Sequence, residues 1–167
     1  IRHFVMDFDC KDFKQRGNDV DFPFMHEQVK RLHRFLQYEN IRHFIWFSGG
    51  GFHFWIPLSK MHTPSNESHK RRIREGGRNL ITGWHKKLNL SCNDPSVAFD
   101  TSGMIRIPNS YNSKRGCWSI PMSSDDILNL THDEIMEKAQ TPASGYIEIE
   151  GEDISITVPE SKSSFKK

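Results

Sequence analysis

Apolar and polar residues alternate with different periods along the chain, and each change of period marks an expected element. Residues 3–9 (HFVMDFD) are rich in Phe and Val, which predicts a strand that ends on acidic residues. From Asp21 to about Glu39 apolar residues recur every three or four positions, and Pro23 suits a first helical turn, so we expect an amphipathic helix. The runs HFIWFS and FHFWIP, joined through three glycines, predict a hairpin over residues 43–57.

Two further helices are expected. A charged segment that ends near Leu88 has apolar residues at helical spacing, although the pair Gly76-Gly77 predicts a break or kink within it. Thr131 and Glu134 have the spacing of a capping box, which predicts the start of a short helix.

The second half of the chain also contains short β-like pieces. Residues 97–100, 104–107 and 117–121 are apolar runs separated by turn-forming residues, and they suggest a second small sheet. Residues 146–158 alternate apolar and polar side chains around Glu-Gly-Glu-Asp, which predicts a hairpin. The whole pattern favours a mixed α+β fold with antiparallel strands flanked by helices.

The length of 167 residues suits a single domain. We expect one compact core over residues 1–160 and a tail or linker over residues 161–167. The chain begins at Ile1, already inside an apolar strand, so we expect it to be a piece of a longer protein.

Composition says more about the cellular environment of the protein than about its function. The formal charge of +2 does not by itself indicate a polyanionic partner. One basic cluster is either a weak nucleic-acid-binding surface or a solvated helix face, and it contains Arg71, Arg72, Arg74 and Arg78. The three cysteines form no CxxC pair, so we expect no disulfide framework, no structural zinc and an intracellular location. No apolar run approaches the roughly 18 residues of a membrane span, and no membrane partner is expected.

Acidic residues end two of the predicted strands. Asp7 and Asp9 are two positions apart, so strand geometry points both carboxylates to one face. Such a pair is half of a Mg²⁺ or Mn²⁺ site, although isolated DxD pairs also arise by chance. Asp100 closes the run Val-Ala-Phe and is either a third metal ligand or a turn residue. Three acids would suit a two-metal phosphoryl-transfer centre.

The glycine hairpin and a later loop carry candidate phosphate ligands. In SGGGFHF the glycines, including Gly50 and Gly51, permit a close approach of phosphate to the backbone, and Ser48 adds a hydroxyl. His53 is either a phosphate ligand or a core histidine. Arg106 and Lys114 supply the cations that a triphosphate requires, or they are surface residues of a loop.

Three segments, in this order, resemble the archaeo-eukaryotic primase superfamily. They are the strand FVMDFD, the segment SGGGFHFWIP and the strand VAFD. The following RIPNSYNSKRGCWSIP resembles the Arg-x-Pro-x-Ser…Lys-x-Gly…Ser-x-Pro pattern of the primase small subunit. The resemblance spans about Phe4 to Met122. Family members usually carry an α/β module before the first motif, and this sequence starts almost on that motif, so we expect template-binding parts to lie outside it. Ser48 stands further from its histidine than in the usual Ser-x-His.

The resemblance implies the primase catalytic fold, with an RRM-like antiparallel sheet. It implies a DNA primase or primase-polymerase that transfers nucleotides from NTP or dNTP to a 3′-hydroxyl on a single-stranded DNA template. Asp7, Asp9 and Asp100 would bind two divalent ions, and the nucleotide's phosphates would meet Ser48, His53, Arg106 and Lys114. A helicase, a primase large subunit or further domains of the same chain would be partners. The short spacing between the motifs suggests a viral or plasmid replication protein.

Two other functions remain open on the sequence. A metal-dependent nuclease also uses clustered carboxylates, but it has no need for the Arg106 and Lys114 pocket. A non-catalytic nucleic-acid-binding module could keep the same fold and use the basic cluster with exposed aromatic residues.

Overall fold

A four-stranded antiparallel sheet lies at the centre of the computed structural model, which describes residues 2–9, 21–93, 98–99 and 105–160. Its strand order is β1-β3-β2-β6, with bounds β1 His3–Asp9, β2 Phe44–Phe47, β3 Gly51–Pro57 and β6 Ile120–Met122. The described elements also include four helices and a two-stranded sheet of β4 (Tyr111–Asn112) and β5 (Cys117–Trp118). The mixed α+β fold expected from the sequence is therefore confirmed, as are the first strand and the glycine hairpin.

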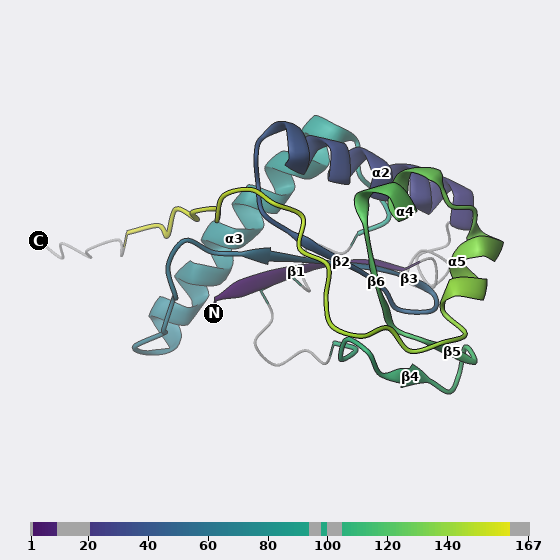
Figure 1. Cartoon of the computed structure of the whole chain (residues 1–167). Coiled ribbons are helices and arrows are strands. Elements are labelled where there is room, and N and C mark those ends of the chain that lie inside the picture. Colours follow the sequence, from purple (N-terminus) through teal and green to yellow (C-terminus); the bar gives the residue numbers. More distant parts are fainter. Residues whose placement is uncertain (1, 10–20, 94–97, 100–104, 161–167) are drawn as a thin grey trace, which may run out of the picture.

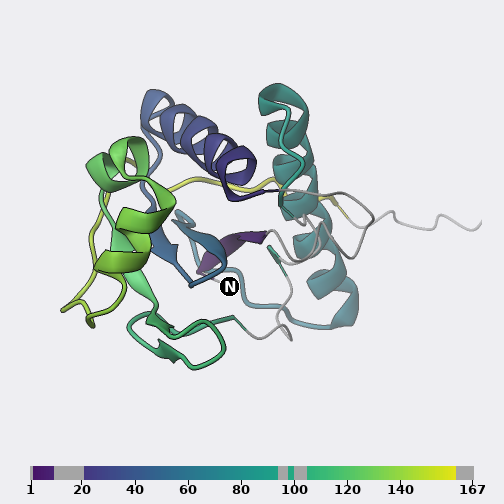
Figure 2. The ribbon, with the colours of Figure 1, turned by 90° about the vertical axis from the view of Figure 1, so that its right-hand side faces the viewer.

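The two faces of the central sheet differ completely in what covers them. Side chains alternate along β1, so that Phe4, Met6 and Phe8 are fully buried on one face. Helices α2 (Phe22–Tyr38) and α3 (Glu67–Leu88) cover that face, with Phe4 against Trp84 at 5.9 Å between ring centroids. Figure 1 and Figure 2 show the helices on this side of the sheet and the β4–β5 hairpin on the other. The acidic face of β1 therefore lies on the side away from the helices.

Local signals set the ends of the two long helices. The Asp21 side chain caps α2 by accepting from the backbone N–H of Phe24, and Pro23 lies in its first turn, as the sequence predicted. Asn66 caps α3 in the same way. The expected break at Gly76-Gly77 is wrong, because α3 runs through both residues.

The C-terminal third departs most from expectation. The capping box of Thr131 and Glu134 is confirmed at the start of α5 (His132–Lys138), and Ser123 with Asp126 forms an unpredicted one at α4 (Ser124–Asn129). The expected strand over 117–121 is divided between two sheets, because β5 pairs with β4 and β6 pairs with β2. Residues 105–107 form no strand, so the predicted piece at 104–107 is wrong in its described part.

The predicted hairpin over 146–158 is also wrong. This segment runs in extended form past the start of β2 and the end of β3 to α3, and we call it the strap (Figure 1). Its backbone pairs with other segments, for example His43 with Ile149 and Leu58 with Ile154. Its alternation is real, but the apolar residues face other elements of the domain and do not pair with one another. No helix in the described ranges is long and apolar enough to cross a membrane.

A buried histidine pair lies beneath the strap. His33 Nδ1 and His43 Nε2 are 3.0 Å apart, and His43 Nδ1 donates to the Ile41 carbonyl at 2.7 Å. Both rings are 0% exposed. Burial, together with the charge of its histidine neighbour, lowers the pKa of His33 to about 4, and burial lowers the pKa of His43 to about 4. Both rings are therefore neutral in the folded protein at pH 7.

Acidification is expected to destabilise the protein well before its carboxylates titrate. The unfolded chain binds these protons near pH 6.5 and the folded chain only near pH 4, so stability is greatest above about 6.5 and falls between these values. The loss is on the order of 3 kcal/mol per histidine. Urea unfolding measured across this range checks it, and His33→Gln should reduce the slope. A flat profile in the unmodified protein would contradict the neutral pair.

Candidate active site

The acids of β1 lie on the open face because the neighbouring apolar residues occupy the core. In the β1–β3 register Asp7 faces His53 and Asp9 faces Gly51. The Asp7 Oδ1 and His53 Nε2 atoms are 3.3 Å apart, and the His53 side chain is 8% exposed. His53 Nδ1 is buried and has no hydrogen-bond partner among the described residues. Nε2 thus faces Asp7, whereas Nδ1 lacks the hydrogen bond that a buried nitrogen normally makes, so a ligand could supply it.

The buried Asn93 and the half-buried His85 hold this end of β1 in place. Asn93 donates through Nδ2 to the Asp7 carbonyl at 2.8 Å and pairs through Oδ1 with His85 Nε2 of α3 at 2.8 Å. Asn93 is 2% exposed. The backbone that carries Asp7 is therefore connected to α3, which limits how far the carboxylate can move.

The turn between β2 and β3 brings the glycines against β1 and the β4–β5 loop. Gly49 has φ +95, and a Cβ there would meet Cys117 Sγ at 2.8 Å and Asn112 Nδ2 at 2.9 Å. A Cβ on Gly51 would overlap the Phe8 carbonyl oxygen. The Ser48 hydroxyl donates to the Gly51 carbonyl at 3.2 Å, and its own carbonyl accepts from Asn112 Nδ2 at 2.8 Å. Ser48 thus closes the turn as well as lining the site.

These elements enclose a polar hollow of about 250 Å³, which we call the phosphate pocket. Its lining comes from β1, the β2–β3 turn, β3 and the loop around β4, and comprises Asp9, Ser48, Gly50, His53, Ile105, Arg106, Asn112, Lys114 and Arg115. Six of these are residues that the sequence singled out as metal or phosphate ligands. Gly51 lies beside the pocket in the ladder with β1, and Asp7 lies behind His53.

The phosphate pocket carries three cationic side chains and one carboxylate, that of Asp9. Such a site favours a polyanion. Burial raises the pKa of the Cys117 thiol, and the positive charges of Arg106 and Arg115 partly oppose this rise. This thiol is therefore neutral, and it adds no negative charge against a bound phosphate.

The carboxylates of β1 are the type of ligand that a divalent metal ion prefers. Asp7 and Asp9 provide two hard oxygen ligands on one strand face, next to a pocket for phosphates. Within the described residues, no group of three or more His, Cys, Asp or Glu could hold an ion. The third predicted ligand, Asp100, lies outside the described residues. Phe99, just before it, stacks on Phe4 of β1 at 5.0 Å between ring centroids.

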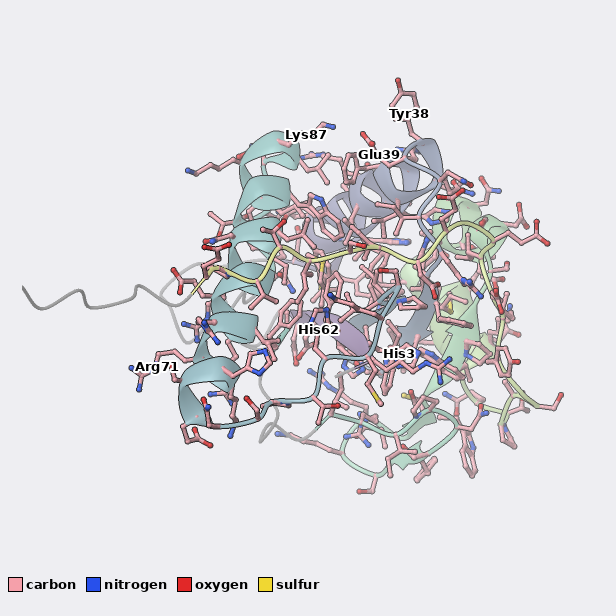
Figure 3. All side chains as sticks on the ribbon, turned by 90° about the vertical axis from the view of Figure 1, so that its left-hand side faces the viewer. His3, Tyr38, Glu39, His62, Arg71 and Lys87 are labelled. Atoms are coloured by element: carbon pink, nitrogen blue, oxygen red, sulfur yellow. The ribbon has the colours of Figure 1, made fainter. Side chains whose placement is uncertain are left out.

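The basic cluster of α3 forms a second hollow of about 510 Å³, which includes Lys70. Arg71, Arg74 and Arg78 line it, whereas Arg72 is not part of its lining, and Glu67 and Glu75 lie among the cations. Figure 3 shows Arg71 projecting outward from α3. Three of the four predicted arginines therefore share one face of the helix.

Two polar residues of the phosphate pocket, Arg115 and Asn112, were missed as site residues, as was the apolar Ile105. Arg115 follows Lys114 directly, and its Nη2 atom would lie 3.2 Å from a Cβ on Gly50. Its place in a basic turn was a usable signal. Asn112 is 6% exposed and holds Ser48 through its side-chain amide. Nothing in its local sequence distinguishes it from the other turn residues.

In comparisons with known proteins, no family model, no curated protein and no solved structure matches this chain.

Proposed function

We propose that this chain is the catalytic core of a DNA primase or primase-polymerase, which transfers a nucleotide from NTP or dNTP to a 3′-hydroxyl directed by a single-stranded DNA template. The observation that carries the proposal is the phosphate pocket. Asp9, Ser48, Gly50, His53, Arg106 and Lys114, far apart along the chain, line one hollow. All of these except Gly50 are residues that the resemblance to archaeo-eukaryotic primases implies.

The cationic and the acidic residues of the site have different roles. Arg106, Lys114 and Arg115 hold the triphosphate and offset the charge that develops on the departing pyrophosphate. His53, with Nε2 facing Asp7, presents Nδ1 to a phosphate oxygen. Asp7 and Asp9, with Asp100, would hold Mg²⁺ or Mn²⁺, which when bound supplies charge neutralisation and activation of the 3′-hydroxyl. No side-chain nucleophile is required, because positioning and electrostatics account for catalysis.

The surplus of cations distinguishes this function from its rivals. A nuclease needs carboxylates at the scissile phosphate but gains little from three cations placed for a triphosphate tail. A non-catalytic module would use the α3 hollow and would not need Asp7 paired with His53.

Labelled-nucleotide incorporation on primed and unprimed single-stranded templates, with Mg²⁺ or Mn²⁺, tests the proposal. Lys114→Ala and Arg106→Ala are each expected to raise the KM for the triphosphate about tenfold, because each removes a charge-assisted phosphate contact. Lys86→Ala, at an exposed position of α3, serves as the matched control and should leave the KM unchanged.

Other products would decide for the rivals. Metal-dependent shortening of the labelled strand would establish a nuclease. Oligonucleotide binding with neither incorporation nor cleavage would establish a binding module.

A further inference from the structure

An aromatic hollow of about 440 Å³ adjoins the phosphate pocket on the open face of the sheet. We call it the aromatic pocket, and its lining comprises His3, Phe44, Trp46, Trp55, Pro108, Asn109, Gly145, Tyr146 and Glu148. Tyr146 meets Phe44 edge to face at 5.7 Å between ring centroids, and His3 meets Trp55 at 6.4 Å. The paired rings are therefore steeply inclined to one another, and together they line the hollow.

Strand register connects the two pockets. Trp46 of β2 is the cross-strand partner of His53, and Trp55 follows His53 by two residues on the same face of β3. Two residues of a strand span about 7 Å. A ligand in the aromatic pocket therefore lies about one nucleotide step from phosphates held at His53.

The lining offers one unsatisfied donor and one unsatisfied acceptor. Trp55 Nε1 and Asn109 Oδ1 are buried, and neither has a hydrogen-bond partner among the described residues. Asn109 is fixed by its left-handed backbone, φ 59, and by donation from Nδ2 to the Gly145 carbonyl at 2.9 Å. Buried polar atoms of this kind normally have partners, so a ligand should supply both an acceptor and a donor.

A nucleobase meets all of these requirements. It is flat, it stacks on aromatic rings, and its edge carries both donors and acceptors. A quaternary ammonium would suit the rings and Glu148, but it has no acceptor for Trp55 Nε1 and no N–H for Asn109 Oδ1. Moreover, Glu148 already pairs with Arg42 at 3.3 Å.

We propose that the aromatic pocket holds an unpaired base of the single-stranded nucleic acid. This inference rests on the proposed function in one respect. In a template-directed transfer the base of the incoming nucleotide must pair with the template, so its edge cannot be bound by Trp55 and Asn109. The occupant is then a base of the strand, adjacent to the reacting phosphates.

Titration of the protein with a short fluorescein-labelled oligodeoxythymidylate tests the inference, in EDTA and without nucleotide, so that no transfer occurs. Tyr146→Ala is expected to weaken binding about fivefold or more, because one stacking ring is lost. Tyr146 is 68% exposed, so its removal leaves the core intact. Asn109→Gly, which keeps the left-handed backbone, should weaken binding in the same direction.

Tyr38→Ala is the matched control, because this tyrosine is 86% exposed at the end of α2 and is absent from the pocket lining. Figure 3 shows Tyr38 and His3 well separated. An abasic oligonucleotide should bind the unmodified protein and Tyr146→Ala equally.

The inference would be overturned if the unmodified protein did not bind the oligodeoxythymidylate, or if Tyr146→Ala and Tyr38→Ala bound it equally well. It would also be overturned if Tyr146→Ala lost as much affinity for the abasic strand as for the oligodeoxythymidylate. A raised triphosphate KM in Tyr146→Ala with unchanged oligonucleotide affinity would also overturn it, by assigning the pocket to the incoming base. Failure of nucleotide incorporation alone would leave the binding results intact, so the two proposals can fail separately.

Discussion

Asp7→Asn and Asp9→Asn are each expected to lower the rate of nucleotide incorporation at least about 100-fold. Asn keeps the size of the side chain and one oxygen but removes the negative charge that a divalent ion requires. Asp7→Asn also weakens the orientation of His53, whose Nε2 lies 3.3 Å from the carboxylate. Steady-state incorporation with saturating Mg²⁺ or Mn²⁺ measures the effect.

Binding of triphosphate in EDTA separates a catalytic role from a structural one. Asp9 is the carboxylate of the phosphate pocket, so Asp9→Asn should leave metal-free triphosphate binding unchanged or make it tighter. Glu150→Gln, at an exposed position of the strap, is the charge-matched control and should retain full activity. Near-normal incorporation by either aspartate variant would refute the metal assignment.

A large loss of stability is expected from Gly76→Ala in α3. A Cβ at this position would overlap the Thr157 carbonyl oxygen of the strap, and a backbone atom cannot move aside as the end of a side chain can. We expect a loss of about 3 kcal/mol in the free energy of unfolding, measured by urea denaturation.

Gly83→Ala provides a control within the same helix. Apart from its chain neighbours and the backbone of its own helix, no heavy atom lies within 4 Å of the added Cβ, so helix propensity alone should decide, and stability should rise by up to about 1 kcal/mol. Equal effects of the two substitutions would show that the strap does not pack on α3 as described.

The glycine pair of α3 explains one failure of the sequence-based prediction. Glycine lowers helix propensity by about 1 kcal/mol per residue, so a break at Gly76-Gly77 was a sound local inference. The absence of a side chain at Gly76 lets the strap pack against α3, and its absence at Gly77 makes room for the ring of Phe99. This close packing offsets the low helix propensity of the two glycines, and no local sequence pattern indicates such contacts.

The strap and β6 show that the local sequence pattern also fails to indicate the partners of extended segments. Alternation over 146–158 correctly indicated extended backbone but gave no information about the partners, which proved to be residues 40–43 before β2 and residues 57–59 at the end of β3. Likewise, 117–121 has the composition of one strand, yet β6 completes the central sheet while β5 stays with β4. Strand pairing depends on segments far away in the chain.

By itself the sequence determined the features that depend on neighbouring residues: the alternation that points Asp7 and Asp9 away from the core, the glycine turn before His53, and the caps of α2 and α5. Only the tertiary structure decided that Arg106 and Lys114 meet Asp9 in one hollow, that Arg115 and Asn112 join them, and that an aromatic pocket lies next to it. The reason is physical: local geometry follows from side-chain period and capping hydrogen bonds, whereas a site requires loops to be placed by packing between distant segments.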